Sequence, residues 1–167
     1  MHRRRFIAGV CIATSIGVAG CLGDDGGTDV DTSSPDAVVE SYHRQGIEVD
    51  SDGLLDLMEA AYHSDSPILQ RMQDGEDGQG ELTGELELES LDVTVAEEGL
   101  SESDLQQALG FFDTPSDERI AEIAAQAETA RVEATKTVSL NGQSSDPATT
   151  EHVVATEDGE WQILTGF

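Results

Sequence analysis

The hydrophobic period changes along the chain, and this change limits the fold more than any other feature. Apolar residues recur at helical spacing from about residue 34 to residue 69, and from Leu82 they alternate with polar residues. Helical spacing returns over 101–129, and the chain closes in two strands joined by the strong turn signal Asp158-Gly159. The chain is therefore expected to combine helices with antiparallel strands.

Short polar residues mark where the helices are expected to begin. Ser34-Pro35-Asp36 supplies an N-cap, a proline at the first helical position and an acid in the first turn. Val38, Val39 and Tyr42 then follow at helical spacing. Further helix starts are expected near Asp52, at Ser66-Pro67, at Ser101 with Asp104 in a capping box, and at Pro115-Ser116-Asp117.

The first long strand is predicted to contain an irregularity. Leu86 and Leu88 share one parity, whereas Leu91, Val93 and Val95 continue on the other. Such a phase slip, placed at Ser90-Leu91, is what a β-bulge in a bent strand produces.

The clearest strand is 131–140, whose predicted core-facing residues are Val132, Ala134, Val138 and Leu140. The terminal hairpin follows from its turn. Counting outward from Asp158-Gly159 places Val154 opposite Ile163 and His152 opposite Thr165. These pairs share a face with Trp161, which we expect to be the core side.

The first 20 residues have the pattern of an export signal. A basic start precedes an apolar stretch over 6–18, which is too short to span a membrane. The stretch ends in Val18-Ala19-Gly20-Cys21, which resembles a lipobox, so Cys21 is predicted to carry a lipid and become the mature N-terminus. Arg3, Arg4 and Phe6 resemble the twin-arginine signal, which a receptor reads as an address. An ordinary signal peptide with a chance cysteine, and a Sec-type signal, are the alternatives.

Residues 21–33 are mostly Gly, Asp, Ser and Thr, which predicts a flexible acidic tether ahead of a domain over 34–167. A lipid at Cys21 would make the membrane a partner and place the domain on the outer face of the cell membrane. A single acyl chain anchors marginally, whereas a two-chain lipid would hold the protein stably.

Acidic residues dominate the chain. It carries 8 Lys and Arg against 35 Asp and Glu, for a formal net charge of −27. Removing residues 1–20 takes away three arginines and no acid, and Lys136 is the only lysine. Proteins of hypersaline organisms use such charge to stay soluble, since salt screens the repulsion. We therefore expect a halophilic archaeal source. The balance argues against nucleic acid as a partner, because phosphate binding needs a basic surface.

The order of elements resembles the NTF2-like, or cystatin-like, cone fold. The opening helix at Ser34-Pro35-Asp36 and the closing Asp158-Gly159-Glu160-Trp161-Gln162-Ile163 carry the resemblance, which covers nearly all of the predicted domain. It implies that N-terminal helices pack on a curved antiparallel sheet, with a pocket at the wide end of the cone. The helical stretch before Arg131 is longer than that family needs, which leaves the strand order open. Another two-layer α+β fold is the alternative.

Lys136 interrupts the apolar face of its strand, between Ala134 and Val138. A lysine aimed at a core is unusual unless it is paired or reaches the surface. In a cone fold it would line the mouth of the pocket, which would suit an anionic or polar ligand with Lys136 as its counter-charge. The candidate pocket residues are Tyr42, Tyr62, Lys136, His152 and Trp161. In the alternative interpretation, Lys136 pairs with one of the many acids and His152 is an edge residue.

No Ser-His-Asp set, zinc spacing or phosphate-binding glycine loop is present, so no catalytic residue, metal or cofactor is predicted. His63 and Asp65 could ligate a metal or form an acid–base pair. A structural role fits them better, with Asp65 or Ser66 capping the turn that enters Pro67 and His63 ending the preceding helix. The sequence favours a membrane-anchored lipoprotein with a non-catalytic ligand- or protein-interaction domain. Alternatives are an isomerase- or hydratase-type enzyme using a pocket acid or histidine, and a solute-binding lipoprotein, for which the chain is short.

Overall fold

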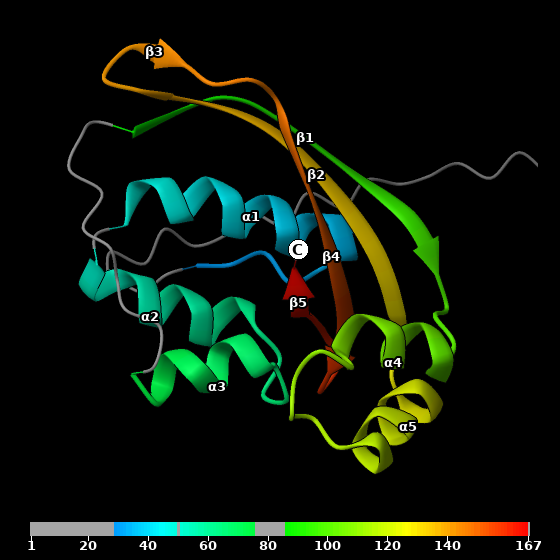
Figure 1. The fold of residues 1–167 in the computed structure, drawn as a ribbon. Coiled ribbons are helices and arrows are strands. Elements are labelled where there is room, and N and C mark those ends of the chain that lie inside the picture. The colour runs from blue at the N-terminus through cyan, green and yellow to red at the C-terminus, as the bar shows by residue number, and fades with distance from the viewer. Residues whose placement is uncertain (1–28, 50, 76–85, 167) are drawn as a thin grey trace, which may run out of the picture.

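The computed structural model describes residues 29–49, 51–75 and 86–166. The predicted signal residues Arg3, Arg4 and Phe6 and the predicted lipidation site Cys21 lie outside them. Over the described residues, five helices pack against a five-stranded antiparallel sheet, which confirms the α+β class (Figure 1).

The helices are α1 (Pro35–Glu48), α2 (Ser51–Ala61), α3 (Pro67–Gln73), α4 (Glu102–Leu109) and α5 (Asp117–Gln126). The strands are β1 (Leu86–Glu98), β2 (Thr129–Leu140), β3 (Gln143–Ser144), β4 (Ala148–Glu157) and β5 (Glu160–Gly166). The sheet order is β1-β2-β4-β5, and β3 pairs only with β2. In Figure 1 the long strands arch over α1.

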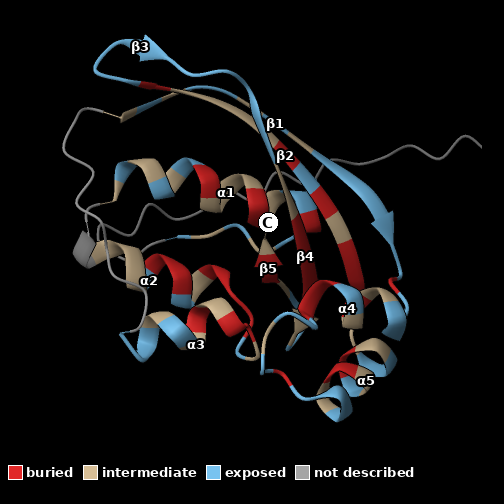
Figure 2. Ribbon diagram, in the orientation of Figure 1, coloured by how far each residue is buried: buried red, intermediate tan, exposed pale blue. Residues whose placement is uncertain are grey.

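Helices cover the sheet from both sides. One core joins α1, α2 and α3 to β2, β4 and β5, and it contains the fully buried Val39, Val132 and Ile163. A second core joins α4 and α5 to β4 and β5, with Leu105 and Leu164 at its centre. Because side chains alternate along a strand, β4 and β5 supply both cores, and Figure 2 shows these strands buried at the middle of the fold.

The predicted helix starts are confirmed where the structure describes them. Ser34, Ser66 and Ser116 cap α1, α3 and α5 through side-chain oxygens that accept backbone N–H groups. Ser101 and Asp104 form the expected capping box on α4. The stretch before β2, which left the strand order open, is thus two helices that cover the second face of the sheet.

The register of β1 and the burial of Leu140 differ from the prediction. The bulge in β1 falls between Leu88 and Ser90, one step before the predicted position, and a second shift follows Val95. Leu140 was expected in the core but is 42% exposed, because the end of β2 runs past the helices and pairs only with β1 and β3. The predicted strand start at Leu82 lies outside the described residues.

The pairing of His152 with Thr165 is wrong. The turn residues Asp158 and Gly159 adopt positive φ, and Val154 lies opposite Ile163 as expected. The register then shifts, because Leu164 is an extra residue in β5 that has no partner in β4. The bulge moves Thr165 opposite Val153 and leaves Gly166 opposite His152.

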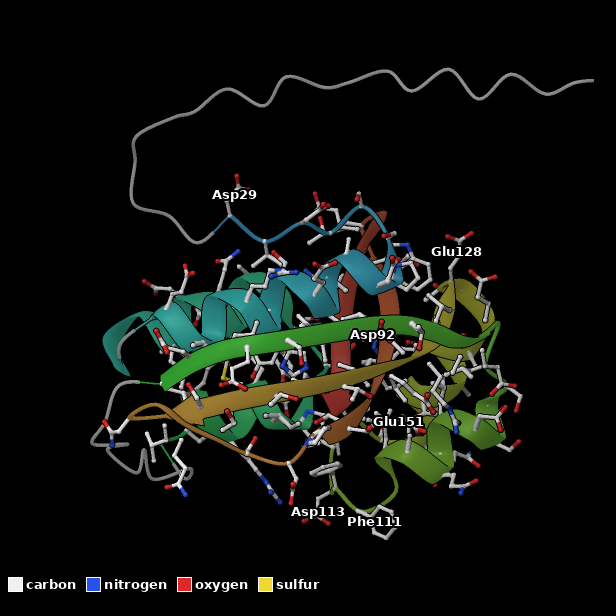
Figure 3. The ribbon with its side chains drawn as sticks, turned by 90° about the horizontal axis from the view of Figure 1, so that it is seen from above. Asp29, Asp92, Phe111, Asp113, Glu128 and Glu151 are labelled. Atoms are coloured by element: carbon white, nitrogen blue, oxygen red, sulfur yellow. The ribbon has the colours of Figure 1, made fainter. Side chains whose placement is uncertain are left out.

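Residues 29–33, the described end of the predicted tether, lie along α1. The Asp29 carbonyl accepts from Gln45 Nε2 at 2.7 Å, and the Thr32 carbonyl accepts the Trp161 N–H at 3.0 Å. Exposed carboxylates are spread over the molecule, and Asp29, Asp92 and Glu128 lie well apart in Figure 3. None of the described helices is long and apolar enough to cross a membrane.

Candidate functional site

A cavity of about 510 Å³ opens between the C-terminal half of α1 and the sheet. Its lining residues are Tyr42, His43, Gly46, Ile47, Leu54, Tyr62, Leu86, Lys136, Val138, Thr150, His152 and Gly166. The cavity has the size and the mixed lining of small-molecule sites, mostly apolar with a few convergent polar groups. None of these lining residues is Asp or Glu, although 35 of the 167 residues of the chain are.

Three basic side chains form a hydrogen-bonded chain in this cavity. Lys136 Nζ lies 3.3 Å from His43 Nδ1, and His43 Nε2 lies 2.9 Å from His152 Nε2. The two imidazole rings meet edge to face, with centroids 5.0 Å apart. His43 and His152 are 6% and 2% exposed, so α1 and β4 hold both rings inside the protein.

In the Lys136–His43–His152 network, each residue donates a hydrogen bond to the next. A lysine ammonium can only donate, so His43 accepts at Nδ1 and carries its proton on Nε2. His43 Nε2–H then donates to His152 Nε2, which leaves the His152 proton on Nδ1. Among the described residues, His152 Nδ1 has no hydrogen-bond partner. The network therefore assigns one tautomer to each ring.

The β5 bulge makes room for the His152 ring. A Cβ atom at Gly166 would lie 2.6 Å from His152 Nδ1 and 2.8 Å from its Cε1, closer than real Cβ contacts. With the unshifted register, Thr165 would occupy this place. The extra residue Leu164 thus sets a glycine against the ring, and the ring can turn toward His43.

Burial keeps both rings neutral. Burial, Lys136 and His152, in that order, lower the pKa of His43 to about 3. Burial and then Lys136 lower the pKa of His152 to about 4. Burial also lowers the pKa of Lys136 below its ordinary value. At neutral pH the cavity wall therefore contains one cationic group and two uncharged imidazoles.

Two tyrosines complete the polar part of the wall. The rings of Tyr42 and Tyr62 meet edge to face with centroids 5.2 Å apart, and Tyr42 also contacts His43 at 5.5 Å. Burial, the electrostatic interaction with Tyr42 and a side-chain hydrogen bond with Tyr42, in that order, raise the pKa of Tyr62 well above its ordinary value. The Tyr62 phenol therefore remains a protonated hydrogen-bonding group.

Lys136 differs from the arginines in its partners. Arg44, Arg119 and Arg131 form ion pairs with carboxylates, and the guanidinium of Arg71 lies 5.3 Å from the centre of the Phe112 ring. Among the described residues, Lys136 has no carboxylate within ion-pair distance; its partner is the uncharged His43. The lysine therefore keeps donors and a charge available to the cavity.

The structure brings together four of the five predicted pocket residues. Tyr42, Tyr62, Lys136 and His152 line the cavity, whereas Trp161 lies beside Thr129 and Glu128, in a separate depression. The prediction missed His43 and Thr150. His43 follows Val39 by four residues and so lies on the buried stripe of α1, a spacing that could have identified it.

His63 and Asp65 lie elsewhere, between α2 and α3. The Asp65 backbone N–H donates to His63 Nδ1 at 3.1 Å, and the Asp65 carboxylate accepts from Arg119 Nε at 2.8 Å. Ser66, and not Asp65, caps α3. In the described part of the chain, no three His, Cys, Asp or Glu side chains converge as metal ligands would.

Comparison with known proteins leaves the family of the chain open. No protein-family model matches the chain, and no curated protein or solved structure is significantly similar to it.

Substituting the two glycines of the cavity wall tests the packing at His152. Gly166→Ala should lower the free energy of unfolding by about 1–3 kcal/mol, since the new methyl group meets the buried ring. Gly46→Ala is the matched control: its Cβ would be 3.7 Å from Leu57 Cδ2, and it should gain about 0.5–1 kcal/mol of helix propensity. Urea denaturation measures both. Equal stabilities for Gly166→Ala and the wild type would contradict the described register.

The two cavity histidines should contribute to the pH dependence of stability. Their pKa values are lower in the folded chain than the ordinary 6.5, so the unfolded chain binds more protons between pH 6.5 and about 4. Stability from these groups is present above pH 6.5 and declines as the pH falls through this window. NMR of the ring carbons should show both histidines uncharged at pH 5.5. Protonation of either ring near pH 6.5 would contradict the burial argument.

Proposed function

We propose that this chain is a membrane-anchored surface lipoprotein whose domain binds a small anionic molecule without transforming it. The N-terminal sequence supports the anchor, through the lipobox-like Val18-Ala19-Gly20-Cys21, and the twin-arginine-like Arg3, Arg4 and Phe6 support export. The surplus of acids supports a halophilic source, in which high salt screens the repulsion between them.

One observation carries the binding proposal: among the described residues that line the cavity, the only lysine of the chain is present and no carboxylate is. Acids make up about a fifth of the chain. Within the part of the chain that the structure describes, no acid lines this cavity, and Lys136 lines it without a carboxylate partner. A desolvated cation without a counter-ion costs free energy, so its presence is best explained by a ligand that supplies the negative charge.

The resemblance to the NTF2-like fold supports the same proposal. Helices packed on an arched antiparallel sheet, with a cavity between α1 and the strands, agree with the pocket that this family carries at the wide end of its cone. The two helices α4 and α5 on the second face are an addition to that plan.

The alternative is an enzyme of the isomerase or hydratase type that uses a cavity acid or histidine as a base. A general base works best when its pKa lies near the ambient pH. The described residues of the cavity wall include no carboxylate, and the pKa values of His43 and His152, about 3 and 4, make both rings weak bases at pH 7. Binding is therefore the better supported function.

The anchor is tested by Cys21→Ser. Expressed in its native host, the wild-type protein should partition into detergent and its mature N-terminus should carry a lipid detectable by mass spectrometry. The variant should lack the lipid and leave the membrane fraction. An unmodified Cys21 in the wild type, or a wild-type chain that retains residues 1–20, would contradict the anchor.

The binding role of Lys136 predicts how the ligand-free protein responds to Lys136→Met. A cation that serves a ligand adds little to folding, so the free energy of unfolding should change by less than about 1 kcal/mol or increase. Arg44→Met is the matched control, because it removes one charge from an exposed ion pair with Glu40, of similarly small value. A loss of several kcal/mol for Lys136→Met alone would show that the lysine is structural.

A further inference from the structure

The apolar side chains of the cavity wall indicate which kind of ligand body can bind there. Ile47, Leu54, Leu86 and Val138 line the cavity from α1, α2, β1 and β2. These four side chains offer no hydrogen bond, so any polar group placed against them would be desolvated without a partner. A hydrocarbon body is the group that gains free energy there.

The polar side chains of the cavity wall indicate which kind of charged group can bind there. One ammonium, that of Lys136, supplies the charge, and one of its three protons is already donated to His43. The remaining donors suit the oxygens of a single charged group. Phosphate dianions are bound by arginine forks or by several cationic or N–H donors, and none of the described residues that line the cavity is an arginine.

We propose that the cavity takes a monocarboxylate with an apolar body, its carboxylate on Lys136 and its hydrocarbon against Ile47, Leu54, Leu86 and Val138. This inference rests on the proposed function and narrows it to one ligand class. His43 and His152 act as positioning residues. They hold the Lys136 ammonium over the cavity through uncharged acceptors, so they neither compete with the ligand for the lysine charge nor add a second charge.

The test compares four probes on the full chain carrying Cys21→Ser, so that no attached lipid competes. The probes are octanoate, octanol, octylammonium and inorganic phosphate. Isothermal titration is performed at a KCl concentration at which circular dichroism shows the protein folded. Octanoate should bind about tenfold to a hundredfold more tightly than octanol, because it adds a charge-assisted hydrogen bond to the same hydrocarbon contact. Octylammonium and phosphate should bind more weakly than octanol or not at all.

A second variant isolates the contribution of the lysine. In Lys136→Met the affinity for octanoate should fall to that for octanol, while the affinity for octanol stays the same. Arg44→Met, which removes a cation outside the cavity, should leave all four affinities unchanged. The ring nitrogens of His43 and His152 should keep their tautomers when octanoate binds to the wild type, as their ¹⁵N shifts would show.

Each contrary outcome has one meaning. Equal affinities for octanoate and octanol would overturn the carboxylate class, as would tighter binding of octylammonium. Phosphate as the best probe would overturn the class while leaving anion binding in place. Absence of binding by octanoate, octanol and phosphate would overturn both this inference and the proposed function. If Arg44→Met lost octanoate binding to the same extent as Lys136→Met, the loss in both variants would come from the change in net charge. That result would overturn the assignment of the carboxylate to Lys136.

Discussion

The structure depends on the burial of the β4–β5 hairpin from both sides. Val154 and Ile163 pack against α1, α2 and α3, whereas Val153 and Leu164 pack against α4 and α5. These side chains are fully buried. Each layer of helices therefore gains its apolar contacts from the same two strands, and the layers stabilise one another through a hairpin that neither layer could cover alone.

The candidate site is built where this hairpin departs from regular pairing. The extra residue Leu164 fills the second core, and the shift that it causes places Gly166 opposite His152. One irregularity thus completes the packing on one face of the sheet and opens space for a buried ring on the other. The His152 ring in turn accepts a hydrogen bond from His43, which accepts one from Lys136. The bulge, by making room for the His152 ring, therefore helps to position the Lys136 ammonium.

Local signals in the sequence predicted most of the elements. Ser34-Pro35-Asp36 and Asp158-Gly159 specify their structures through short-range hydrogen bonds and backbone conformation, so the chain alone reveals them. The turn at Asn141-Gly142, also at positive φ, carried the same kind of signal and was missed. The β5 bulge has no local signal, because it follows from fitting Leu164 into a core made by distant helices. The Lys136–His43 contact joins residues 93 positions apart, so no local sequence pattern could predict it.

The contrast between an acidic chain and a cavity whose described lining residues include no carboxylate has a consequence for the approach of an anion. An anion that approaches Lys136 must first cross the field of a surface with a large negative charge, and in dilute buffer that field repels it. At molar salt the field extends only about 3 Å from each charge, so the path to the cavity opens. For an ordinary lysine–carboxylate contact, added salt slows association. Here the same salt would speed association, because it screens the negative surface that lies between the solution and Lys136.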